Sequence, residues 1–223
     1  MRAISPVDPT CHPGPGPDAA PARRPAAVAA VVDAVVVGVV AAIVGALHGF
    51  DGRLIPDVGV FTYGGERFSH GVLPYLGVFN TVGPLADAVP GAAIALGRHL
   101  GVAPISAERH AFWLLSVACC VLVAAFGRQV SGRRSVGLLA AAILMTFDDF
   151  THLATDGPRE KTVMVLFLLA ALLLMGRRRW VLAGACTAIA TLTWQPVLAV
   201  ALAAAAASVL GTPRGRRWRA AIG

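Results

Sequence analysis

The sequence predicts an all-α protein, a polytopic bundle of transmembrane helices with about six crossings. Hydrophobic residues make up 57% of the 223-residue chain and charged residues only 14%, whereas a soluble domain carries about 25% charged residues. The hydrophobic residues also stand in long blocks instead of alternating with polar ones, which is typical of membrane-spanning helices. Between these blocks lie short stretches that are rich in arginine.

The formal net charge of +7 does not indicate a nucleic-acid partner. The arginines cluster in short connections between apolar blocks, where they orient membrane spans. We therefore expect membrane lipids as partners, and no nucleic acid. The four cysteines show no CxxC spacing, so we expect them to be buried as small apolar residues.

The first transmembrane helix is predicted over Ala26–Leu47, after a tail that we expect to be disordered because it is rich in proline (residues 1–25). About 22 residues are long enough to cross a bilayer. Arg23 and Arg24 directly precede the span and predict a cytoplasmic N-terminus in the cell membrane. Asp33 lies inside the span, where a carboxylate should face the bundle or extend toward the near interface.

A long first extracytoplasmic loop is predicted next, over residues 49–109. It contains the polar segment Pro56–Leu85 between two apolar blocks. Its second half, Pro84–Leu100, is apolar but interrupted by charged residues and prolines. We expect an interfacial helix there and not a further span.

The remaining blocks predict five more crossings. Single spans are expected at Ala111–Phe126, Ser135–Phe147 and Thr162–Met175. Asp148 and Asp149 should form an acidic outer loop. In the stretch that follows, Gly157 as cap and Pro158 as first helical residue predict the start of a helix.

The apolar stretch 180–210 is too long for one crossing, since about 31 helical residues would extend about 46 Å. Arginines flank it on both sides, so an even number of crossings is expected. Pro196 breaks the stretch, which predicts a helical hairpin with Thr193–Pro196 at its outer tip. The transmembrane domain then covers residues 26–211, and residues 212–223 form a basic cytoplasmic tail.

This topology collects three polar segments on the outer surface: 56–85, 148–161 and 193–196. Convergent polar groups over an apolar bundle define a plausible site. Asp57 follows the first span closely and could act as general base on an acceptor hydroxyl. The alternative is an ordinary loop aspartate that caps a helix beginning near Val58.

Two cations stand at the outer end of a predicted span, against the positive-inside tendency. Arg159 and Lys161 could bind a phosphate there, because guanidinium groups fork a phosphate and an ammonium group acts as a point charge. Alternatively they form surface pairs with Asp156 and Glu160. Arg67 could assist them, or form only a solvated ion pair with its neighbour in sequence.

Several short motifs follow one another in a recognisable order. The first outer loop contains Asp57–Tyr63, Gly71–Tyr75 and Asn80–Leu85; later segments contain Thr155–Pro158, Arg177–Trp180, Leu182–Gly184 and Leu192–Pro196. Over residues 26–210 this order and spacing resemble the motifs of membrane glycosyltransferases of the GT-C fold. These are enzymes similar to the protein-mannosyltransferases and the lipid A aminoarabinose transferases.

The resemblance implies an inverting transferase that takes a sugar from a polyprenyl-phosphate donor. Asp57 would be the catalytic base, and the acceptor would be the hydroxyl of a glycan, a lipid or a protein. A divalent metal is possible, and no other cofactor is expected. Besides Arg159 and Lys161, the resemblance assigns substrate binding to the following residues: Arg67, Tyr75, Asn80, Asp156 and Glu160.

The chain departs from the family pattern at three places. Val58 replaces an acidic residue, Val82 replaces a lysine, and Trp194-Gln195 replaces Lys-Gly. The family also has more spans, so we expect this chain to be an N-terminal portion of such an enzyme. The alternative from a different class is a non-catalytic membrane protein, such as a subunit, a scaffold or a transporter fragment. A transporter should place its polar groups at mid-membrane, whereas here they stand at the outer ends of spans.

Overall fold

A computed structural model describes residues 23–53, 55–76 and 80–210. Over these residues the chain forms nine α-helices and no strand, which confirms the all-α class. The predicted tail at 212–223 and residues 1–22 of the N-terminal tail lie outside the described residues. The first helix begins at Arg23, within the segment that was expected to be disordered.

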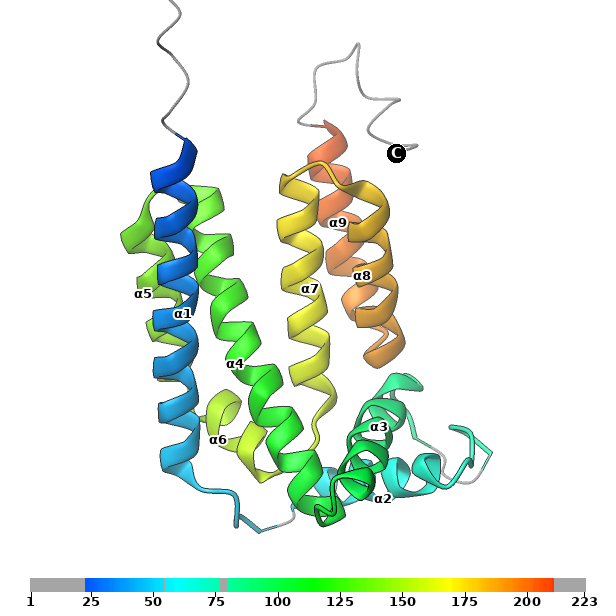
Figure 1. Cartoon of the computed structure of the whole chain (residues 1–223). Coiled ribbons are helices and arrows are strands. Elements are labelled where there is room, and N and C mark those ends of the chain that lie inside the picture. The colour runs from blue at the N-terminus through cyan, green and yellow to red at the C-terminus, as the bar shows by residue number, and fades with distance from the viewer. Residues whose placement is uncertain (1–22, 54, 77–79, 211–223) are drawn as a thin grey trace, which may run out of the picture.

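The helices form a bundle with a cap at one end. Six of them run roughly along a common direction (Figure 1): α1 (Arg23–His48), α4 (Pro104–Ser131), α5 (Arg134–Met145), α7 (Glu160–Gly176), α8 (Trp180–Thr193) and α9 (Val197–Leu210). The other three helices gather at the end of the bundle opposite to the start of α1 (Figure 1): α2 (Pro56–Ser69), α3 (Leu85–His99) and α6 (Asp148–Asp156).

Two of the described helices are long and apolar enough to cross a membrane, Ala27–His48 of α1 and all of α4. A third candidate arises if α5 and α6, which meet at a bend of 59°, count as one span. These helices support a membrane protein with two or three candidate spans. The other apolar helices include α8 and α9, which are shorter.

Small side chains let the helices approach closely. One buried cluster joins α1, α4 and α5 and consists of Val37, Ala41, Cys120, Ala124 and Ala141. A Cβ atom added at Gly137 of α5 would lie 2.3 Å from the backbone oxygen of Ala124 in α4. Such contacts between small residues are how helices pack when lipid removes the hydrophobic drive between them. Large apolar side chains of α1 point outward instead, as at Val31, which is 63% exposed.

The structure corrects two local predictions after α5. The expected acidic loop at Asp148 and Asp149 is the first turn of α6, where carboxylates stabilise the positive end of the helix dipole. The next helix begins at Glu160 and not at Pro158. The reason is that Arg159 has an extended backbone, with a φ of −141° and a ψ of 133°. Gly157 is also far from helical values, with a φ of 155° and a ψ of −165° that are essentially restricted to glycine.

Much of the polar segment after α1 is helical and not loop. Its first half is α2, which begins at Pro56 because proline suits the first turn. The expected helix over Pro84–Leu100 is present as α3. The two helices pack closely, since a Cβ atom at Gly91 would lie 2.8 Å from the backbone oxygen of Gly65.

The hairpin predicted over residues 180–210 is present, with its break between Thr193 and Val197. Its tip contacts the segment that follows α2. The Gly83 N–H donates to the backbone oxygen of Thr193 at 3.1 Å. A Cβ atom at Gly83 would lie only 1.9 Å from the backbone oxygen of Leu192, so this contact requires glycine. Two of the three polar segments expected on one surface therefore meet.

We expect Gly83→Ala to lower the stability of the fold by about 2 kcal/mol, because the added methyl group must push two backbone segments apart. Denaturant-induced unfolding in detergent measures the effect. Gly184→Ala in α8 is the matched control, since nothing lies within 4 Å of its added Cβ and alanine favours a helix. Equal stability of the two variants would contradict the contact.

Candidate functional site

The first turn of α2 and the start of α7 bring two predicted site residues together. Nη2 of Arg159 lies 3.8 Å from Oδ2 of Asp57. The side chain of Asp57 is 70% exposed, while that of Arg159 is only 13% exposed. An ion pair this exposed adds little stability, so the carboxylate remains accessible at the capped end of the bundle.

Val58 fixes the position of Asp57. It is fully buried and seated on the link between α6 and α7, where a Cβ atom at Gly157 would lie 2.5 Å from its Cγ1. Glycine at this place serves both the backbone conformation and the close approach of α2. Val58 therefore has a packing role next to the candidate base.

Arg109 of α4 binds both the connection that leads into α2 and the end of α6. Its side chain donates three hydrogen bonds, all to backbone oxygens: Nε to Asp156 at 2.8 Å, Nη1 to Phe50 and Nη2 to Gly52. The first acceptor lies just before the α6–α7 link, and the other two lie in the connection that leads into α2. One planar guanidinium group thus fixes the segments that lead to Asp57 and to Arg159.

A cavity of about 450 Å³ opens beside Arg159. Its lining combines two cations with an apolar wall and one carboxylate: Phe147, Asp149, Phe150, Leu153, Arg159, Lys161 and Thr162. Lys161 is exposed and is the only lysine in the chain. A forked guanidinium group beside an ammonium group suits a phosphate, and the apolar wall suits a lipid chain.

The alternative partners proposed for Arg159 lie elsewhere. Asp156 is buried, with Oδ1 3.9 Å from Nε2 of His152, and it packs against Gly52 so closely that no Cβ atom fits there. Glu160 is buried in the first turn of α7, and its Oε2 has no hydrogen-bond partner in the described part of the chain. Arg159 forms its ion pair with Asp57 instead.

Tyr75 and Asn80 hold the segment between α2 and α3. The Tyr75 hydroxyl donates to the backbone oxygen of Val82 at 2.7 Å, and Tyr75 has a φ of 69°, which favours glycine. Asn80 is buried and donates from Nδ2 to Oδ1 of Asp87 at 3.2 Å. Burial raises the pKa of Asp87, whereas the hydrogen bond from Asn80 lowers it. Both predicted binding residues thus have partners within the protein.

Arg67 is not brought to the cavity. It is exposed in the last turn of α2, ten positions and roughly 15 Å along the helix axis from Asp57. Among the described residues, no group of three or more His, Cys, Asp or Glu side chains could hold a metal ion.

Arg109 and Glu108 were missed as site residues. Both are buried near the start of α4, where the sequence predicted the end of an outer loop. The available signal was an arginine at the outer end of an apolar block, against the positive-inside tendency. The same signal singled out Arg159.

No protein-family model matches this chain, and neither a curated protein nor a solved structure matches it.

We expect Arg109→Lys to destabilise the fold by about 3 kcal/mol, because an ammonium group cannot serve three carbonyls placed around a planar fork. Urea titration in detergent micelles measures this loss. Arg98→Lys is the control, because the hydrogen bonds of exposed Arg98 are to side chains, those of Ser69 and His70 at the end of α2. Its effect should stay within about 0.5 kcal/mol. Similar losses in both variants would mean that the three carbonyl contacts contribute little.

Proposed function

We propose that the protein transfers a sugar from a polyprenyl-phosphate donor to an acceptor hydroxyl. The observation that carries the proposal is the accessible carboxylate of Asp57 beside Arg159, which itself lines a cavity together with Lys161. A base for the acceptor and cations for a leaving phosphate are thereby adjacent. The order of motifs that resembles the GT-C glycosyltransferases supports the same reaction.

The donor phosphate would lie between Arg159 and Lys161. As the acceptor oxygen attacks the anomeric carbon, Asp57 takes the hydroxyl proton. The bond between the anomeric carbon and the phosphate oxygen breaks, and the lipid phosphate leaves with the electron pair. The configuration is inverted, and the two cations stabilise the charge that develops on the phosphate. The proton then passes from Asp57 to water.

The proposed frame is a membrane bundle of six crossings with a cytoplasmic N-terminus and the site on the outer face. Its support is the distribution of arginine: Arg128, Arg133, Arg134 and the run Arg177–Arg179 belong to the connections at the end opposite to the site. Positive residues favour the cytoplasmic side. Helices α5 and α8, with 12 and 14 residues, would extend about 18 and 21 Å, so they would cross only with the turns that flank them.

Loss of the Asp57 carboxylate should abolish most of the activity. We expect Asp57→Asn to lower the rate of labelled-sugar transfer from polyprenyl phosphate by about 100-fold or more, the usual contribution of a general base. Membranes that contain the 223-residue chain serve as the enzyme source. Asp51→Asn removes a carboxylate from the connection that leads into α2 and should leave the rate unchanged. Equal rates for wild type and Asp57→Asn would exclude Asp57 as the base.

Binding of the donor can be measured without turnover, because Lys161 is the only lysine in the chain. We expect polyprenyl phosphate to protect Lys161 from an amine-reactive reagent, as followed by peptide mass spectrometry. Modification of the N-terminal amine in the same sample is the internal control and should not change. Protection that is equally strong with the unphosphorylated polyprenol would argue against a phosphate site.

A further inference from the structure

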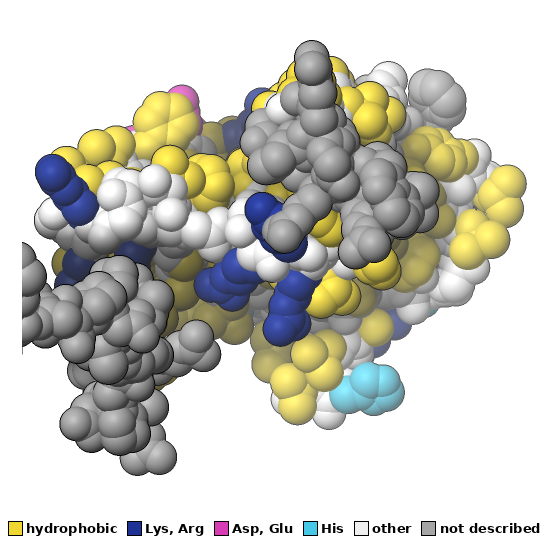
Figure 2. All heavy atoms as spheres, turned by 90° about the horizontal axis from the view of Figure 1, so that it is seen from above, with side chains coloured by type: hydrophobic (Ala, Val, Ile, Leu, Met, Phe, Trp, Pro, Cys, Tyr) yellow, Lys and Arg dark blue, Asp and Glu magenta, His cyan; other side chains and the backbone are white. Residues whose placement is uncertain are grey.

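A second cavity lies far from the proposed active site, at the end of the bundle where α1 begins. Its volume is about 370 Å³, and it opens between α1, α4, α5 and the end of α7. Figure 2, which looks onto this end, shows positively charged side chains (dark blue) here with hydrophobic side chains around them. The cavity plays no part in the proposed transfer.

The polar side of this cavity carries an excess of positive charge. Among the described residues, the charged ones in its lining are Arg128, Arg134, Arg177 and Asp33, which is three positive charges against one negative charge. The carboxylate of Asp33 accepts from Nε of Arg134 at 2.6 Å and lies 3.4 Å from Nη1 of Arg128. The described part of the lining therefore carries a formal excess of positive charge, which favours an anion.

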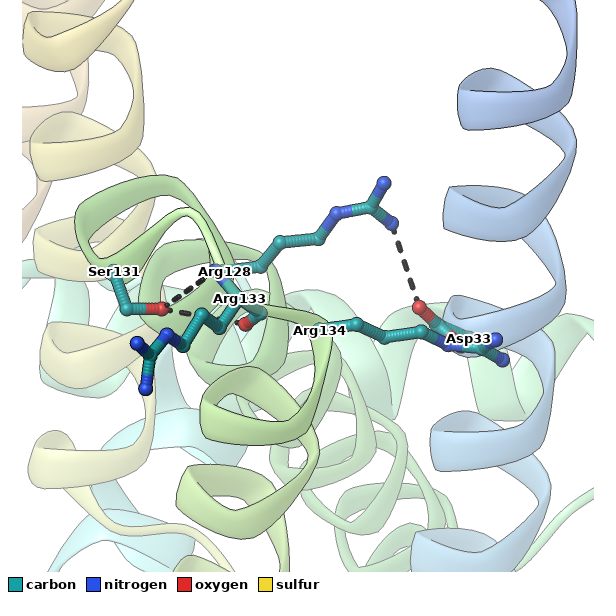
Figure 3. Close-up of polar contacts among 5 residues, drawn as sticks. All are labelled: Asp33, Arg128, Ser131, Arg133 and Arg134. Atoms are coloured by element: carbon teal, nitrogen blue, oxygen red, sulfur yellow. Dashed lines mark hydrogen bonds and ion pairs between the residues drawn. The ribbon is translucent and has the colours of Figure 1, made fainter.

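Local structure aims two of these arginines at the cavity. Arg128 lies in the last turn of α4 and Arg134 begins α5, and both reach toward Asp33 on α1, whereas Arg133 between them points away (Figure 3). The turn is held by Ser131, whose hydroxyl donates to the backbone oxygen of Gly127 at 2.6 Å and accepts from the Arg133 N–H at 3.1 Å. The paired arginines are therefore preorganised.

The other side of the cavity is apolar. It is formed by side chains of α1, α4 and α5: Ala30, Ala34, Val121, Ala124, Ala125 and Leu138. A soluble phosphate would gain nothing from this wall, whereas a phospholipid presents a charged headgroup joined to apolar chains. Asp33 lies six residues beyond Ala27, roughly 9 Å along the helix axis. This depth is comparable with the headgroup and upper chain region of a bilayer.

We propose that this cavity binds the phosphate of an anionic membrane phospholipid. The headgroup phosphate lies among the three guanidinium groups, and an acyl chain follows the apolar wall toward the outward valines of α1. Basic pockets between transmembrane helices are suited to such headgroups. The bound lipid would tie α1 to the end of α7, which α1 does not otherwise contact extensively.

Native mass spectrometry of the full chain in detergent tests the proposal by measuring the apparent Kd of phosphatidylglycerol and of phosphatidylcholine. We expect the wild type to prefer phosphatidylglycerol. Arg177→Gln should weaken phosphatidylglycerol binding about fivefold, since one cation near a lipid surface contributes about 1 kcal/mol. Arg177 is exposed and is not needed to balance Asp33, so this variant should fold normally.

Arg179→Gln is the matched control. It removes the same charge from the same connection, but Arg179 does not belong to the cavity lining, so its binding should match that of the wild type. Equal losses in both variants, or equal binding of the two lipids, would overturn the proposal. Inorganic phosphate provides a further arm. If it stabilises the lipid-free protein against thermal unfolding as strongly as phosphatidylglycerol does, and this effect depends on Arg177, the lipid assignment is wrong.

Discussion

The three hydrogen bonds of Arg109 are the constraint on which the capped end of the molecule depends. A buried guanidinium group inside an apolar bundle must have its donors satisfied, and here the partners are the carbonyls of Phe50, Gly52 and Asp156. The first two carbonyls belong to the connection that leads into α2, and the third belongs to the last residue of α6. Satisfying one charged side chain therefore also fixes a connection without regular structure and the end of a helix.

The opposite end of the bundle solves a similar problem in a different way. Asp33 is a buried carboxylate on a membrane-length helix, and it is compensated by arginines from the turn between α4 and α5. The two ends thus share one principle, in which α4 supplies a cation at each end to satisfy an acceptor on another element. Helix α4 contacts α1, α2, α3, α5, α6 and α7, so both compensations act through the same central helix.

The sequence predicted the helical class and the break at Thr193–Pro196, and it left two orientations for Asp33, toward the bundle or toward the near interface. Each prediction depends on hydropathy or on the cost of a lone charge in an apolar setting. The conformation of Gly157 was missed, because glycine before proline suggests a helix start by local preference alone. The pairing of Asp57 with Arg159 was anticipated only as two segments on one surface. The partners of Arg109 could not be predicted, because they are backbone carbonyls and every residue type has one.

The contact between Gly83 and the tip of the α8–α9 hairpin has a mechanical consequence. The segment that leads into α3 and the end of α8 are joined by a backbone hydrogen bond with no space for a side chain between them. Neither can lift away as an independent flap over the capped end. A displacement of the segment before α3 would therefore have to move the end of α8 as well.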